Sequence, residues 1–107
     1  MTNMLVIMCT CPDEATASKL ASGLVEERLA ACVNILSGVR SIYRWQGEIC
    51  DDAEVLMIIK SQEMHYEAVE SWLQEQHPYA VPEVVALPVS SVSDSYRKWL
   101  ETSVKKS

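Results

Sequence analysis

Two segments of the chain are apolar at almost every position, and this pattern restricts the fold more than any other feature. The runs "LVIMC" at 5–9 and "EVLMIIK" at 54–60 do not alternate apolar with polar residues. A strand with one face in water alternates, whereas a strand buried on both faces is apolar throughout. We therefore expect both segments to be strands of a sheet that is covered on both faces.

Helical spacing and breaking residues predict the helices. Apolar residues from Ala17 to Leu29 recur at helical spacing, and Asp13 is placed to cap this first helix. Ser61 is expected to cap a second helix, which His77-Pro78 ends because the residue before proline avoids helical backbone. Ser93 or Asp94 would cap a terminal helix whose inward residues are Tyr96, Trp99, Leu100 and Val104.

The remaining segments are β-rich. Residues 31–45 and 48–60 flank the turn signal Gln46-Gly47 and predict a long hairpin, with a bulge or bend at Ser37-Gly38. Residues 4–11 predict the first strand, and residues 83–89 predict the last.

The predicted order is βαββαβ followed by a tail helix. This is the α+β, ferredoxin-like sandwich built on a split βαβ plan, and residues 1–107 are expected to form one domain. Two helices can cover only one face of such a sheet. Because the strands are apolar on both faces, we expect another copy of the chain to cover the second face.

Charge and hydropathy narrow the partners and the location. The formal net charge is −6, so a nucleic-acid backbone is not expected as a partner. No apolar stretch approaches the roughly 20 residues of a membrane span, and no basic leader precedes the N-terminal apolar run. We expect no membrane association and a cytoplasmic location. The four cysteines are accordingly expected to be free thiols rather than two disulfides.

Five blocks of sequence together resemble the CutA family of divalent-cation tolerance proteins. They are "CTCPDEATA" at 9–17, "ERLAACVN" at 27–34, "SIYRWQGEI" at 41–49, "EVLMIIK" at 54–60 and "HPYAVPEVVALPV" at 77–89, followed by "YRKWL" in the tail. The resemblance implies a ferredoxin-like protomer in a tight homotrimer, a cytoplasmic protein linked to copper and divalent-ion tolerance, and no established catalytic reaction. It also implies an assembly similar to the PII-type regulatory trimers.

The resemblance places candidate metal ligands at Cys9 and His77. Copper favours thiolate and imidazole ligands, although a free cysteine is as readily a small buried hydrophobe. Gln76 stands where copper-binding members often carry a second histidine, so weak copper binding is expected, with Cys11 partly replacing the missing ligand. We expect no organic cofactor. Packing is expected for Cys32, an exposed position for Cys50 and a solvated surface position for His65.

A second set of residues combines aromatic rings with charges. Such residues could form a small-ligand pocket at a subunit boundary, or could simply anchor and neutralise an interface between subunits. The set comprises Trp45, Glu54, Lys60, Tyr79, Glu83 and Trp99.

Three common catalytic motifs are missing from the sequence. It has no glycine-rich phosphate loop, no Gly-x-Ser-x-Gly elbow and no His-Glu-x-x-His, and nothing indicates that Cys9 and His77 act as nucleophile and base. We therefore expect a protein that is not an enzyme. Three classes stay open: a metal-binding trimer, a PII-like trimer that senses a small molecule, and a structural or anchoring trimer.

Overall fold

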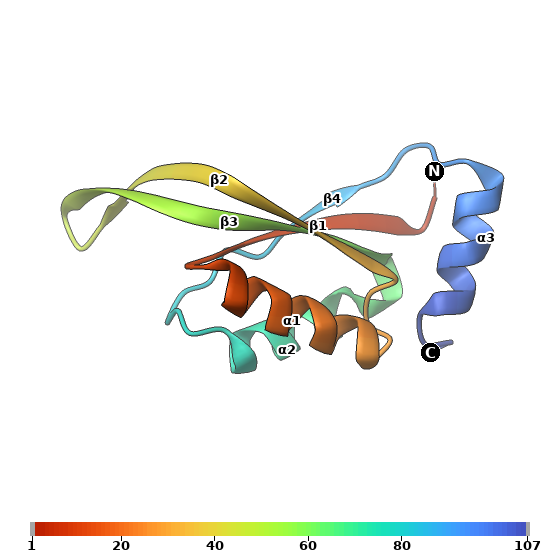
Figure 1. Cartoon of the computed structure of the whole chain (residues 1–107). Coiled ribbons are helices and arrows are strands. Elements are labelled where there is room, and N and C mark those ends of the chain that lie inside the picture. The colour runs from red at the N-terminus through yellow and green to blue at the C-terminus, as the bar shows by residue number, and fades with distance from the viewer. Residues whose placement is uncertain (1, 107) are drawn as a thin grey trace.

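The computed structural model describes residues 2–106 as a four-stranded sheet with two helices on one face (Figure 1). The sheet order is β2-β3-β1-β4, and every neighbouring pair is antiparallel. The elements are β1 (Met4–Cys11), α1 (Glu14–Glu26), β2 (Cys32–Trp45), β3 (Glu48–Gln62), the 3₁₀ turn η1 (Glu63–His65), α2 (Tyr66–Gln76), β4 (Val85–Pro88) and α3 (Asp94–Ser103). This confirms the ferredoxin-like α+β prediction. No helix in residues 2–106 has the length and apolar character needed to cross a membrane.

The core lies between the sheet and helices α1 and α2. Alternate residues of β1 and β3 point into it, and Ile7, Cys9, Met57 and Ile59 are each fully buried there. Val69 and Leu73 close the core from α2. Since successive strand residues point to opposite faces, the intervening apolar residues lie on the other face of the sheet.

That other face is only partly covered in the protomer. Val6, Met8, Leu56 and Ile58 are half-buried on it. The register places Leu36 on the same face, opposite Leu56, and its side chain is 43% exposed. The sequence predicts that both faces of the sheet are covered. Within the protomer, only the face that carries the helices is fully covered.

The hairpin of β2 and β3 extends as an arm beyond the helices (Figure 1). Its register shifts between Leu36 and Val39, where Gly38 has a φ of +83°, so the predicted bulge at Ser37-Gly38 is confirmed. Gln46 and Gly47 both have positive φ, as a two-residue hairpin turn requires. Ile42 and Ile49 of the arm are 64% and 69% exposed.

Two of the three predicted helix caps are confirmed. The Asp13 carboxylate accepts the Thr16 N–H at 2.7 Å, and the Ser93 hydroxyl accepts the Tyr96 N–H at 3.3 Å. The prediction that Ser61 caps the second helix is wrong. Strand β3 continues through Ser61, whose buried hydroxyl donates to the Leu29 carbonyl at 2.6 Å. The β-ladder with Met4 and Leu5 keeps this segment extended.

Three further expectations are wrong. The last strand is Val85–Pro88 and not 83–89, because pairing to β1 reaches only these four residues. His65 is buried rather than solvated, and its Nε2 lies 2.8 Å from the Lys105 carbonyl oxygen. Trp99 was expected to face inward but is 46% exposed, whereas Leu100 and Val104 are buried against Met4 and Ala31.

Candidate functional site

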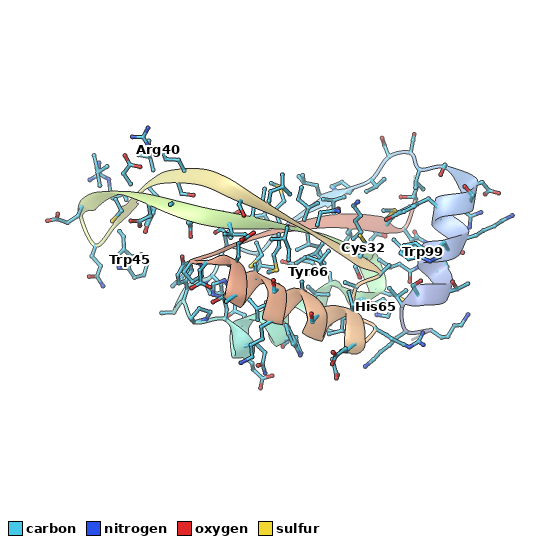
Figure 2. The ribbon with its side chains drawn as sticks, viewed as in Figure 1. Cys32, Arg40, Trp45, His65, Tyr66 and Trp99 are labelled. Carbon is cyan, nitrogen blue, oxygen red and sulfur yellow. The ribbon has the colours of Figure 1, made fainter. Side chains whose placement is uncertain are left out.

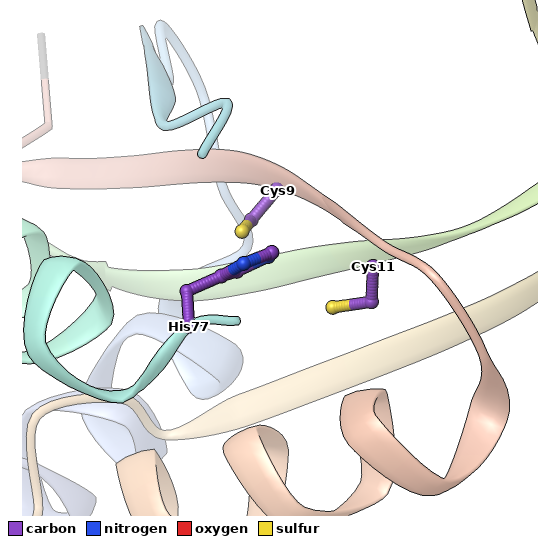
Figure 3. Close-up of side chains that lie close together, drawn as sticks. All are labelled: Cys9, Cys11 and His77. Carbon is purple, nitrogen blue, oxygen red and sulfur yellow. The ribbon is translucent and has the colours of Figure 1, made fainter. Parts of the chain in front are cut away.

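Two strand cysteines and one loop histidine meet at the end of β1 (Figure 3). Cys9 and Cys11 lie two residues apart on β1, so both side chains point to the helix-covered face. His77 follows the last residue of α2 and comes toward them from the opposite side. All three side chains are buried, and their potential ligand atoms lie within 4.8 Å of one another.

Backbone groups hold the His77 ring in place. Its Nδ1 accepts the Tyr79 N–H at 3.1 Å, which leaves the proton of a neutral ring on Nε2. Nε2 then donates to the Thr10 carbonyl at 2.8 Å. Both ring nitrogens are satisfied, so a metal bound to His77 would have to replace one of these hydrogen bonds.

The two thiols influence one another. The hydrogen bond with Cys11 and complete burial both raise the pKa of the Cys9 thiol. Cys9 is therefore a thiol and not a thiolate at neutral pH. A metal ion would have to displace its proton, which makes any metal binding at this cluster pH-dependent.

The donor set fits a soft metal ion. Two sulfurs and one imidazole nitrogen are ligands that favour Cu(I) over hard cations such as Mg²⁺. A spacing of up to 4.8 Å is somewhat wider than the roughly 4 Å between ligands of a three-coordinate ion with bonds of about 2.0–2.3 Å. A small inward movement of these side chains would complete the coordination.

A pocket of about 720 Å³ lies along the hairpin arm, between the arm and the loop that joins α2 to β4. Trp45 projects from the arm on the side of the helices, and Arg40 projects on the other side (Figure 2). The pocket is lined by Thr10, Ser41, Ile42, Tyr43, Trp45, Glu54, Pro78, Tyr79, Ala80, Val81 and Glu83.

Carboxylates hold two phenols of this pocket. The Tyr79 hydroxyl donates to Glu54 Oε2 at 2.7 Å, and the Tyr43 hydroxyl donates to Asp52 Oδ2. Burial and the bond to Glu54 raise the pKa of Tyr79, and the bond to Asp52 raises the pKa of Tyr43 to about 12. Both phenols are therefore neutral donors at physiological pH.

The six predicted pocket residues separate into two groups in the protomer. Trp45, Glu54, Tyr79 and Glu83 line the pocket. Lys60 and Trp99 lie at α3 instead: the Lys60 Nζ is 5.9 Å from the Tyr96 ring centroid, and the Tyr96 and Trp99 ring centroids are 5.3 Å apart with the rings tilted by 44°.

Sequence reasoning missed several lining residues. Ser41 and Tyr43 share a face of β2 with Trp45 because they lie at every second position. This period-two signal could have found them. Thr10 carried no comparable signal, since only the fold brings the end of β1 to this pocket.

The other singled-out cysteines and Gln76 do not join the cluster. Cys32 and Cys50 are half-buried, Cys32 opposite Lys60 and Cys50 opposite Tyr43, and both are free thiols. Gln76 is exposed at the end of α2.

Comparison with known proteins places the chain in a family. A family model described as "CutA1 divalent ion tolerance protein" matches residues 5–103. The "Divalent-cation tolerance protein CutA" of Pectobacterium atrosepticum is 48% identical over 101 residues, covering 94% of this chain and 92% of that protein.

Solved structures agree. The divalent cation tolerance protein of Thermus thermophilus superposes with a TM-score of 0.92 at 43% identity, covering 95% of this chain and 99% of that one. CutA1 from Oryza sativa superposes with a TM-score of 0.94 at 39% identity, covering 97% and 95%. The chain thus belongs to the CutA1 divalent ion tolerance protein family, as its sequence motifs indicated.

Proposed function

We propose that the chain forms a homotrimeric divalent-cation tolerance protein that binds copper weakly at Cys9, Cys11 and His77. The observation that carries the metal assignment is the convergence of two thiols and an imidazole within 4.8 Å. Within residues 2–106 these side chains are the one group of three potential His, Cys, Asp or Glu ligands that lies this close. The family name refers to tolerance of divalent ions rather than to a catalysed reaction, and we propose no catalytic role.

The chemistry of the cluster favours the reduced ion. Thiolates are soft ligands, so Cu(I) should bind better than Zn(II). The thiols must also stay reduced, which a reducing compartment such as the cytoplasm ensures. We therefore propose a cytoplasmic protein that holds copper as Cu(I).

An anaerobic titration with Cu(I), in competition with a coloured Cu(I) chelator, tests the metal site. Replacing Cys9 or His77 removes one of three ligands, so Cys9→Ser and His77→Asn should each lower the affinity by at least about tenfold. The matched control is Cys50→Ser, because Cys50 is a free thiol on the hairpin and lies outside the cluster. Equal Cu(I) affinity in Cys9→Ser and Cys50→Ser would disprove the assignment.

Self-association is proposed from the uncovered sheet face and the hairpin arm. A two-stranded arm that packs on nothing is at best marginally stable in water, yet this arm carries Ile49, which is exposed and lies outside the pocket lining. A second copy of the same chain offers the matching apolar surface. The family likeness supports three copies arranged in a closed ring.

The pocket favours a second candidate function. A cavity of about 720 Å³ lies within the range typical of small-molecule sites, so a PII-like trimer that senses a small molecule is the alternative. A thermal-shift screen of metabolites at constant protein concentration separates this function from a purely anchoring trimer, since only a binding protein is stabilised by ligand.

A further inference from the structure

We propose that the pocket along the hairpin arm binds a small organic cation with an alkylated ammonium group. The site is distinct from the proposed copper cluster and does not depend on it. The proposal follows from the chemistry of the pocket wall, its hydrogen bonds and the position of nearby positive charges.

Aromatic rings and carboxylates form the wall together. Tyr43, Trp45 and Tyr79 each contribute a ring, and Glu54 and Glu83 contribute negative charge. Rings attract a cation through their negative faces, and aromatic cages of this composition hold quaternary ammonium groups in other proteins. In the described part of the chain, no Lys, Arg or His lines this pocket, so no basic side chain is there to balance the charge of an anionic ligand.

The phenol-carboxylate bonds prepare the rings for a cation. Tyr79 donates to Glu54 and Tyr43 donates to Asp52, so each hydroxyl proton is already committed. These bonds fix the ring orientations, and donation to a carboxylate makes each ring richer in electrons. Both changes strengthen attraction of a cation to the ring faces.

The arginines of the arm do not neutralise the pocket. Neither Arg40 nor Arg44 is among the residues that line the pocket. The Arg44 side chain instead donates to the Gly47 carbonyl at the hairpin turn, at 3.4 Å. Arg40 forms two hydrogen bonds with Asp51, at 2.9 and 2.6 Å, and lies on the far side of the arm from Trp45 (Figure 2). The negative charge of Glu54 and Glu83 is thus available to a ligand.

An organic cation fits better than a metal ion. In the described residues, the carboxylates of Glu54, Glu83 and Asp52 do not form a group of three ligands close enough together to hold a metal ion. The volume of about 720 Å³ also exceeds what a bare ion needs. Ile42, Pro78 and Val81 supply apolar lining for the carbon body of the ligand.

Choline and its uncharged isostere 3,3-dimethyl-1-butanol are the matched probes. The chain has three tryptophans, whose indole N–H signals can be followed separately by NMR in the intact assembly. We expect choline to shift the Trp45 signal saturably while those of Trp72 and Trp99 stay in place. We expect the neutral isostere to leave Trp45 unshifted. If choline leaves the Trp45 signal unshifted, the proposal is wrong, and this includes the case in which a second copy of the chain fills the pocket. Equal shifts with choline and the neutral isostere would also overturn it.

Paired variants locate the site by calorimetry. Trp45→Leu and Glu54→Gln should each weaken choline binding about fivefold or more. Trp99→Leu is the control for Trp45, because both residues are 46% exposed. Glu70→Gln is the control for Glu54, because Glu70 accepts a similar bond from Tyr66 at 3.0 Å. Equal losses in the controls would rule out this pocket.

Two further variants keep the outcome clear. Glu83→Gln changes an exposed side chain, so it tests the charge requirement without disturbing the core, and it should also weaken choline binding. Cys9→Ser should retain choline binding while its affinity for Cu(I) falls. If Cys9→Ser keeps both choline binding and full Cu(I) affinity, the copper site is wrong and the choline pocket stands. If a folded Cys9→Ser protein loses choline binding, the proposal of a separate pocket is wrong.

Discussion

His77 connects the fold to both proposed sites through one side chain. Its N–H donates to the Leu73 carbonyl at 2.8 Å as α2 ends, and its ring bridges Thr10 of β1 and the Tyr79 backbone. The same ring stands beside the two thiols, and the Tyr79 that it positions lines the pocket. A substitution at His77 is therefore expected to affect the loop as well as copper binding.

The tyrosines provide a pH prediction at the scale of single residues. All four tyrosines have raised pKa values in the folded protein, Tyr43 to about 12. The pKa of a tyrosine in the unfolded chain is about 10, so the folded protein keeps its phenol protons to higher pH than the unfolded chain does. Since the native state then binds more protons than the unfolded state, the free energy of unfolding should fall as pH rises through this interval.

Ultraviolet titration of the phenolates and urea unfolding across this pH range measure the effect. Tyr43→Phe and Tyr79→Phe should each make the pH dependence of unfolding shallower, because each removes one shifted group. Native phenols that titrate together with those of the urea-unfolded chain would contradict the prediction.

At the scale of elements, Gly23 sets how closely α1 can approach α2. A Cβ at this position would lie 2.5 Å from two ring carbons of Trp72. Alanine inside a helix normally stabilises it by roughly 0.5–1 kcal/mol relative to glycine. Here the clash should dominate, and Gly23→Ala is expected to destabilise the protein by about 1–3 kcal/mol.

Chemical denaturation tests this packing. In a Trp72→Leu background the clash is removed, so the same Gly23→Ala change should be neutral or stabilising. A stabilised Gly23→Ala single variant would show that the indole can move aside without loss.

At the scale of the whole molecule, the open sheet face should hold the trimer together. Light scattering is expected to report a mass of about three protomers. Leu36→Glu places a charge on that face and should lower the mass toward the monomer. Val25→Glu is the matched control on α1, because Val25 is 42% exposed and Leu36 is 43% exposed. A monomeric parent protein, or dissociation by both variants, would contradict the proposed interface.

The sequence by itself determined the order of the elements, the hairpin and the family. Local chemistry sets these features: two-sided apolar runs define β1 and β3, positive φ at Gln46 and Gly47 defines the turn, and Asp13 caps α1. Each depends on neighbours along the chain, so a reader of the sequence can find it. Trp45, Glu54, Tyr79 and Glu83 were singled out from the sequence, and they line one pocket of the protomer.

Only the tertiary structure decided which distant residues meet. Ser61 is a strand residue because pairing with β1 outweighs its capping preference, and His65 is buried because the Lys105 carbonyl reaches it from the far end of the chain. Lys60 lies beside α3 and Trp99 lies on α3, away from the pocket, because the sheet register and the docking of α3 place them there. Such contacts depend on packing between segments that are remote in sequence, so no local sequence pattern predicts them.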